Sequence, residues 1–455
     1  MQHDKQLTVN FDGLRTGSGP ATWGQRTIWK PISWYAPDDH FFNIGLLLPL
    51  RHPTAPAEFA QAVGALLERH ESLRTCYTAD GDSGLTQHLL GSGTLAVRLV
   101  HAESQTATAA LAGALEQDKA LRFDLLAQQP PLRITAVLVA GQVTGAALTL
   151  AHIAADATGA RVVLDDLRRL LVQRRRAPQV LPPRVPGRQP LEQAAYEASA
   201  VAHTRSEAAI ALWSRQLDSV PASLWPDPTG PGESERWWEG ILDCPRLDLA
   251  SRLAARRLGS SASAVVLAAV GVELGLLTGR QAVGLKVILG NRASREQQQA
   301  VGAFPQNGLV VLGTSGDFDE LVGQAWRAQL KTSRHGHYDA DAMERAIAAA
   351  EKRRGEPIDL TSYFNDHREG PDPALDGAEP AGLPDGAFRW RSRWARQDSA
   401  FFFGLATAGG STTASLLVDT RLFPARQVEP FLRAVQARVV AAVAPTVAAT
   451  VAAEG

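Results

Sequence analysis

The residues best suited to chemistry in this sequence are a histidine and an aspartate four positions apart. His152 ends the apolar run from Leu148 to Ala151, and Asp156 comes just before an amphipathic segment. A neutral imidazole can accept a proton from an attacking nucleophile. A buried carboxylate beside it would need a cationic partner. The pair therefore predicts general-base chemistry at His152, and the alternative is a core histidine satisfied beside a helix cap.

Two elements must position these side chains. Residues 143–152 are mostly small and apolar, as in a buried strand, so we expect His152 at the end of a strand. An amphipathic pattern directly after Asp156 predicts a helix, with the apolar positions Val162, Val163, Leu167, Leu170 and Leu171. Asp156 or Thr158 would cap this helix. The positive helix end would then lie near the imidazole and favour its neutral form.

The rest of the chain alternates strands and helices in both halves, which predicts two similar α/β lobes. We expect helices near residues 22–29, 56–70, 191–217, 246–257, 262–277, 317–333 and 425–443. We expect strands near residues 42–50, 72–77, 85–90, 132–139, 283–290, 308–313, 400–407 and 412–418. Five prolines within residues 177–190 predict a linker. The N-terminal lobe would then cover residues 1–176 and the C-terminal lobe residues 191–455.

Length and composition exclude several classes of protein. A chain of 455 residues is too long for one ordinary core, and a net charge of −1 argues against nucleic acid as a partner. The N-terminus lacks the apolar core of a signal peptide, and the apolar run 262–277 contains Glu273 and reads as a buried helix, so no membrane is expected. With only Cys76 and Cys244, we expect no metal and a cytoplasmic location.

Other motifs carry little weight. The loop Gly81-Asp-Ser-Gly84 imitates a protease nucleophile loop but lies in a turn of an α/β chain. His335 and His337 could be a metal pair, but no third ligand is suggested. The chain has no G-x-S-x-G elbow, no P-loop and no dinucleotide fingerprint.

Several segments, in order, resemble the core motifs of the condensation-domain superfamily of nonribosomal peptide synthetases. They are Thr22 to Trp29, Arg69 to Thr75, Phe123 to Leu125, Pro131 to Arg133, Ala151 to Ala157, Asn291 to Arg292, Val301 to Gln306, Phe364 to Asn365 and Asp419 to Phe423. The resemblance covers about residues 20–440, nearly the whole chain. It makes the catalytic interpretation of His152 the favoured one.

The resemblance implies two chloramphenicol-acetyltransferase-like lobes in a V-shaped pseudo-dimer, with the active site in a tunnel between them. No bound cofactor is implied. An acyl or aminoacyl thioester, presented on the phosphopantetheine of a carrier protein, would react with an amine or alcohol. We expect a free-standing, monomeric enzyme that receives its carrier protein in trans and forms an amide or ester in natural-product biosynthesis.

The resemblance also assigns site residues. His152 matches the second histidine of the family's His-His-x-x-x-Asp-Gly motif and would deprotonate the acceptor amine or hydroxyl, or at least position it. Asp156 would be a structural residue paired with an arginine, for which Arg292 is the best candidate. Gly159 would lie near the phosphopantetheine arm, and Asn365 would face the acceptor.

Three positions depart from the family pattern. Ala151 replaces the first motif histidine, Ala157 replaces the motif glycine beside the arm, and Gln306, expected to contact substrate, replaces an asparagine. Two alternatives therefore stay open. One is a CoA-dependent acyltransferase of the same superfamily, and the other is a non-catalytic member that docks partner enzymes.

Overall fold

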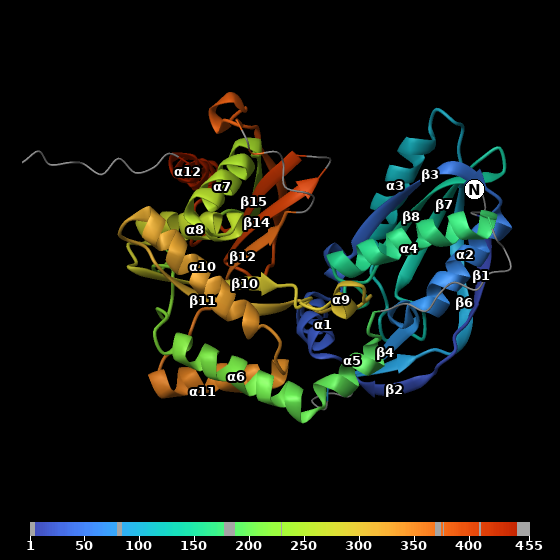
Figure 1. The fold of residues 1–455 in the computed structure, drawn as a ribbon, viewed down its shortest axis with the longest axis horizontal. Helices are drawn as coiled ribbons and strands as arrows, with labels where there is room; N and C mark the ends of the chain where they lie inside the picture. Colours follow the sequence, from blue (N-terminus) through green and yellow to red (C-terminus); the bar gives the residue numbers. More distant parts are fainter. Residues whose placement is uncertain are drawn as a thin grey trace, which may run out of the picture. The chain divides into compact units, whose positions relative to one another are not determined.

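The computed structural model describes residues 5–79, 84–176, 187–228, 230–368, 375, 377–408 and 411–443. Its contacts divide the chain into two compact units, coloured along the sequence in Figure 1. The first unit comprises Met1–Thr204 and Gly290–Gln306, and the second comprises Arg205–Leu289 and Asn307–Gly455. Both units combine strands and helices, as the alternation in the sequence predicts.

This division does not follow the lobes 1–176 and 191–455 predicted from the sequence. Helix α5 (Pro190–Glu197) belongs to the first unit, where Glu197 accepts a hydrogen bond from the backbone N–H of Trp23 at 2.7 Å. The segment Gly290–Gln306 returns to the first unit from the middle of the second. Residues 177–186 of the predicted linker lie outside the described residues.

The first unit is built on a five-stranded sheet in the order β1-β6-β7-β8-β3. The strands are β1 (Lys5–Asp12), β6 (Ser92–His101), β7 (Leu132–Val139), β8 (Gln142–Leu150) and β3 (Ile44–Thr54). Helices α2 (Pro56–Arg69) and α4 (Ala157–Arg176) pack on one face through an apolar core, and α3 (Ala107–Lys119) packs on the other. The sheet thus places β8 between β7 and β3, and β8 leads directly to His152.

A smaller sheet and the helices α1, α5 and α9 also belong to this unit. Strands β2 (Gly17–Pro20), β5 (Leu85–Leu89) and β4 (Thr75–Ala79) form the sheet in that order. Helix α1 (Trp23–Tyr35) begins with a capping box, in which the Thr22 hydroxyl accepts from Gln25 N–H and the Gln25 amide oxygen accepts from Thr22 N–H. A short helix, α9 (Arg295–Gln298), lies in the returning segment.

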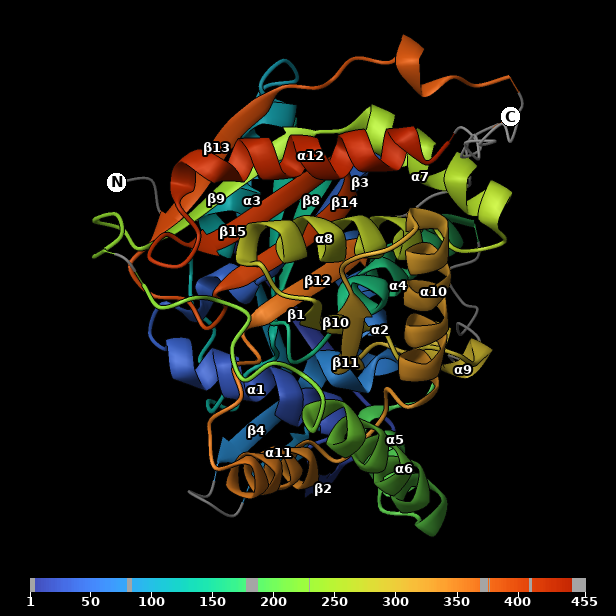
Figure 2. The same cartoon turned by 90° about the vertical axis from the view of Figure 1, so that its left-hand side faces the viewer.

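The second unit holds a seven-stranded sheet in the order β11-β10-β12-β14-β15-β9-β13. Its strands are β9 (Trp237–Asp243), β10 (Ala282–Leu289), β11 (Gln306–Gly313), β12 (Ser362–His367), β13 (Phe388–Trp394), β14 (Phe401–Ala408) and β15 (Ser411–Asp419). Its helices are α6 (Ala200–Leu217), α7 (Pro245–Leu258), α8 (Ala262–Thr278), α10 (Phe318–Arg334), α11 (Ala340–Arg354) and α12 (Val428–Ala441). Figure 2 shows α8 and α12 lying across the strands, and their shared apolar core includes Phe401 and Phe431.

Helix α8 is apolar on nearly all sides because it is enclosed by the second unit. It begins at the Ser261 cap, which accepts from Ala264 N–H at 3.0 Å, and ends at Gly279 in the left-handed conformation. In the described part of the chain, no single helix is long and apolar enough to cross a membrane, although the bent pair α7 and α8 together would be by length and composition.

Candidate active site

The end of strand β8 and the start of helix α4 enclose the His152 turn. Residues Ala151 to Asp156 make the turn, which is fixed at its start by a 3.1 Å hydrogen bond from Ala151 N–H to the Pro131 carbonyl. Ala154 N–H then donates to the Ala151 carbonyl at 2.9 Å. The turn is buried except at His152, which is half-buried. The backbone therefore presents the imidazole at the end of a strand that is paired on both sides.

One hydrogen bond defines the protonation of the neutral His152 ring. Its Nδ1 lies 3.2 Å from the carbonyl oxygen of Ala155. A carbonyl oxygen can only accept, so Nδ1 carries a proton in this contact. The neutral ring then has its lone pair on Nε2. This is the tautomer that a general base acting through Nε2 requires.

Asp156 joins three parts of the first unit. Its Oδ1 accepts from Gly159 N–H at 2.8 Å, which caps the first turn of α4. The carboxylate receives a bidentate pair from Arg292, with Nη2 to Oδ1 at 2.7 Å and Nε to Oδ2 at 3.0 Å. Oδ2 also accepts from Phe304 N–H at 3.3 Å. With its side chain 4% exposed, Asp156 is a structural anchor more than a reacting group.

Arg292 is held by several acceptors besides Asp156. Its guanidinium donates to the carbonyls of Gln297, Ala300 and Gly302 and lies 4.5 Å from the centre of the Phe304 ring. Burial lowers the pKa of Arg292, and the charge of Asp156 opposes that shift. The ion pair meets the need of a buried charge for a matched partner and additional hydrogen bonds.

The backbone around this ion pair is unusually close. Asn291 adopts a left-handed φ of 52° and donates to the Phe304 carbonyl at 3.1 Å, which turns the chain just before Arg292. A Cβ on Gly159 would lie 3.2 Å from Gly302 N and 3.3 Å from Arg292 Nη2. Glycine at 159 therefore lets α4 and the returning segment approach each other.

The segment that follows α2 also holds the His152 turn in place. The Ser72 hydroxyl donates to the Ala154 carbonyl at 2.5 Å, and His70 Nε2 lies 2.9 Å from Asp166 on α4. Arg69 also reaches Asp166, at 3.3 Å. Sequence reasoning identified the segment Arg69 to Thr75 only by resemblance and did not assign it this positioning role. The available sequence signal was the pair of polar residues, Ser72 and Arg74, on either side of the apolar Leu73.

The two alanine departures lie in different environments. Ala151 is 1% exposed and packs in an apolar cluster with Tyr77, Phe123 and Ile153. Ala157 is exposed at the first position of α4. The missing motif histidine thus corresponds to a closed apolar site, whereas the additional methyl group at residue 157 faces outward.

The remaining predicted residues lie elsewhere. Gln306 is 1% exposed, and its Nε2 donates to the Thr27 hydroxyl of α1 at 3.3 Å. Asn365 lies on β12 of the second unit, where its Nδ2 contacts His367 Nε2 at 2.5 Å. Substrate binding by Gln306 and Asn365 stays a prediction. The same holds for the roles of Ala157 and Gly159 beside a phosphopantetheine arm.

Within the described ranges, no group of three or more His, Cys, Asp or Glu side chains could hold a metal ion. His335 Nδ1 lies 2.8 Å from the Lys331 carbonyl of α10.

Comparisons with known proteins identify the family of the chain. The sequence model of the condensation domain matches residues 19–365. The nonribosomal peptide synthetase kk1B of Curvularia clavata is 25% identical over 348 residues, covering 73% of this chain and 3% of that protein. The hybrid PKS-NRPS synthetase poxE of Penicillium oxalicum is 30% identical over 155 residues, covering 32% of this chain and 4% of that protein. The chain therefore spans only a few per cent of the length of these relatives.

Solved structures share the fold. The condensation domain that mediates chain release from the enacyloxin polyketide synthase aligns with a TM-score of 0.73 at 20% identity, covering 98% of this chain and 86% of that one. SgcC5 from Streptomyces globisporus aligns with a TM-score of 0.70 at 18% identity, covering 93% and 98%. The fold is thus the chloramphenicol-acetyltransferase-like α/β fold expected from the motifs. Because the family's sequence model covers most of the chain, the protein belongs to the condensation domain family.

Proposed function

We propose that this protein transfers an acyl or aminoacyl group from the phosphopantetheine thioester of a carrier protein, supplied in trans, to an amine or alcohol. The acceptor nitrogen or oxygen attacks the thioester carbon and loses its proton, and the carbon–sulfur bond breaks. The products are an amide or ester and the free thiol of the carrier. We further propose that the chain acts as a monomer in natural-product biosynthesis.

His152 is the group that moves the proton in this reaction. With a proton on Nδ1 directed at the Ala155 carbonyl, Nε2 is available to take the proton of the attacking amine or hydroxyl. The resulting imidazolium can return a proton to the departing thiolate, so the ring ends the cycle as it began. The Nδ1 contact with Ala155 is the observation that carries the proposal.

Asp156 and Arg292 hold this turn without exchanging protons. Their ion pair and the Gly159 cap join the start of α4 to the returning segment. Both carboxylate oxygens of Asp156 accept charge-assisted hydrogen bonds from Arg292, so the carboxylate is occupied in holding the backbone. Loss of either side chain would therefore act on activity through the position of the His152 turn.

A transfer assay with the His152→Ala variant tests the proposal. Aminoacylated carrier protein and free amine or alcohol acceptors are mixed with wild type and variant, and the product is followed by mass spectrometry. General-base assistance contributes about 10²–10⁴-fold, so the variant should lose at least about 100-fold in rate. Its circular dichroism spectrum and melting temperature should match those of wild type, because the half-buried ring makes a single hydrogen bond to the described residues, to the Ala155 carbonyl. A folded variant with unchanged turnover contradicts the proposal.

Two alternatives have specific support. The starter condensation domain of rhizomide synthetase, which shares this fold at a TM-score of 0.67, was solved with C8-CoA, and this favours CoA as a possible donor. The X-domain from teicoplanin biosynthesis, solved in a complex with OxyB, shares this fold at a TM-score of 0.69. Together with Ala151 in place of the first motif histidine, this favours a docking module as the other alternative. Transfer from acyl-CoA alone supports the first alternative. Wild-type protein that binds carrier protein without any turnover supports the second.

A further inference from the structure

Strand β6 is only partly paired on one of its two sides. Across the described residues it pairs with β1 from Ser92, opposite Asp12, to Leu99, opposite Lys5. Its pairing with β7 begins only at Val97, which lies opposite Ile134. In the described part of the first unit, residues 92–96 therefore have no strand on the side where β7 would continue.

This gap leaves backbone hydrogen-bonding groups without a partner. In an antiparallel pair, alternate residues direct both N–H and C=O to the same neighbour, so roughly two or three of the five residues point away from β1. Across the described residues, no backbone hydrogen bond joins residues 92–96 to the facing loop, Gln128 to Pro131. Unpaired strand groups of this kind are a template for another extended chain.

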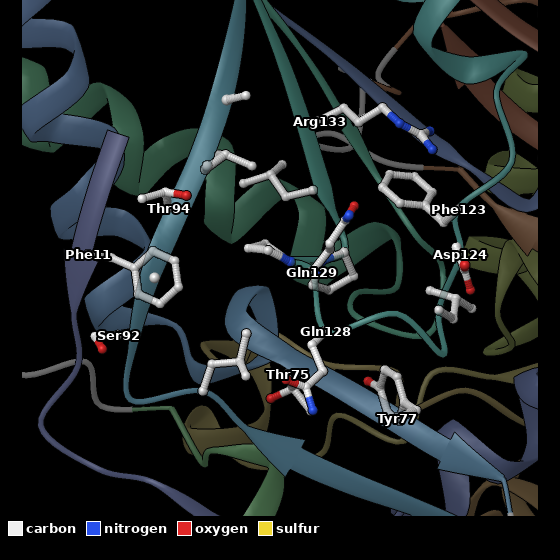
Figure 3. Close-up of a pocket in the computed structure, with 18 residues that line it drawn as sticks. Phe11, Thr75, Tyr77, Ser92, Thr94, Phe123, Asp124, Gln128, Gln129 and Arg133 are labelled. Carbon is white, nitrogen blue, oxygen red and sulfur yellow. The ribbon is translucent and has the colours of Figure 1, made fainter. Parts of the chain in front are cut away.

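A cavity occupies this gap. Its volume is about 540 Å³, within the range of about 300–1,000 Å³ typical of small-molecule sites. Figure 3 shows Thr94 and Phe11 on one side, Phe123 and Arg133 on the opposite side, and Gln129 between them. Five strand residues extend for about 16 Å, which is long enough to accompany a chain of three or four residues.

The lining of the cavity favours an uncharged ligand. Its two charged residues are Asp124 and Arg133. Arg133 donates to the carbonyls of Leu121 and Arg122 and stacks over Phe123 at 3.7 Å. Asp124 accepts from Leu126 N–H at 3.3 Å. The other polar groups are neutral hydroxyls and amides, which suit peptide groups better than ions.

We propose that this cavity, between residues 92–96 of β6 and the loop Gln128 to Pro131, binds a short, extended, uncharged peptide as an additional strand. The peptide would pair with β6 through its backbone N–H and C=O groups. A peptide presents such groups at the two-residue repeat of a strand. A pantetheine chain has one more methylene group between its two amides than a peptide has and cannot keep that repeat.

The cavity shares a wall with the His152 turn. Tyr77, Phe123 and Leu125 line the cavity and also pack in one apolar cluster with Ala151. Pro131 lines the cavity as well, and its carbonyl accepts from Ala151 N–H. A peptide bound here would therefore press on the residues that fix the turn, although binding itself does not depend on the proposed reaction.

A binding titration tests this inference. The probe is N-acetyl-trialanine methylamide. Its binding to the 455-residue protein is measured by NMR chemical shifts or calorimetry. A matched depsipeptide has one central amide N–H replaced by an ester oxygen, and pantetheine is a third ligand. We expect saturable binding of the peptide and at least fivefold weaker binding of the depsipeptide and of pantetheine.

Two tryptophan variants provide the matched comparison. Ala96 is exposed and lines the cavity, and Thr8, its exposed partner on β1, does not. Ala96→Trp should weaken peptide binding at least tenfold, and Thr8→Trp should stay within twofold of wild type. Melting temperatures report whether both variants fold, and the depsipeptide comparison in wild type needs no variant.

The inference is overturned if the peptide does not bind wild type, if the depsipeptide or pantetheine binds equally well, or if a folded Ala96→Trp variant binds like wild type. Because His152 does not line the cavity, His152→Ala should leave the peptide affinity unchanged. Failure of the reaction mechanism and failure of this binding site therefore give different results.

Discussion

At the scale of single residues, the ring of His152 and the carboxylate of Asp156 serve different needs. Among the described residues, the His152 ring makes one hydrogen bond, from Nδ1 to the Ala155 carbonyl, and it is half-buried. Its Nε2 is therefore left to react. Asp156 is buried, caps α4 and holds Arg292 and Phe304 N–H. Mutations at the two positions should therefore separate chemistry from stability.

Breaking the buried ion pair should cost much more stability than breaking an exposed one. Replacing Asp156 with Ala leaves the Arg292 guanidinium buried without its partner, which costs about 3–5 kcal/mol in unfolding free energy. Asp165 on the same helix pairs with Arg168, and both side chains are nearly half exposed, so Asp165→Ala should cost about 1 kcal/mol or less. Urea unfolding measures both. Equal losses would contradict the anchoring role of Asp156.

Restoring the family's first histidine should destabilise this chain. Ala151→His places an imidazole in a closed apolar cluster, where overpacking costs about 1–3 kcal/mol. Ala157→Gly, which restores the motif glycine at an exposed helix start, should cost no more than about 1 kcal/mol. Thermal unfolding of the two variants compares them. A histidine at residue 151 that leaves the melting temperature unchanged would show that the cluster is not tightly packed.

At the scale of elements, long periodic segments were predictable and context-dependent ones were not. The patterns at 56–70 and 246–257 correspond to α2 and α7, because apolar spacing is a local property. The continuous apolar run 262–277 corresponds to α8. The segment 191–217, predicted as one helix, is divided into α5 and α6. Helix α3 was missed, since its many alanines give it little amphipathic contrast. Strand β6 was missed as well.

The contact between the segment after α2 and helix α4 should make stability depend on pH. Burial lowers the pKa of His70, and Asp166 offsets only part of that shift. As pH falls, His70 therefore gains a proton in the unfolded chain before it does so in the native protein. Because the unfolded state binds more protons, the free energy of unfolding should fall as pH drops below about 6.5. Burial raises the pKa of Asp166, but His70 and Arg69 outweigh it and leave it lowered, which adds a loss at still lower pH.

The variant His70→Gln should reduce this slope between pH 7 and pH 5. His52 is exposed on β3, and His52→Gln should keep the wild-type slope. Denaturant unfolding at several pH values gives the comparison. If the free energy of unfolding changes with pH equally in wild type and His70→Gln, His70 is excluded as the source of the pH dependence.

At the scale of the whole molecule, the sequence could predict the α/β class and the family but not which segments share a compact unit. The proline-rich segment indicates irregular chain, yet α5 beyond it is tied back to α1 through Glu197 and Trp23. Similarly, Arg292 lies 136 positions from Asp156, so only the resemblance, and no local spacing, could suggest their pairing. The gap beside β6 is a tertiary feature with no sequence signal of its own, and the polar residues around Leu73 do not reveal that Ser72 contacts the Ala154 carbonyl.

The preference of the whole protein for a carrier-bound or a CoA-bound acyl donor can be tested directly. Carrier-bound donors should be used in preference to the same acyl group on CoA, because the proposed function takes a carrier protein as partner. We expect at least a tenfold higher kcat/KM for the acyl carrier protein. A preference for acyl-CoA would move the protein to the CoA-dependent alternative.

The most direct test of the account is the single-turnover rate of acyl transfer from a loaded carrier protein for wild type and His152→Ala at equal, saturating protein. The account predicts a fall of at least about 100-fold in the variant, with the same melting temperature as wild type. Equal rates in the two proteins would contradict His152 as the general base and with it the proposed mechanism.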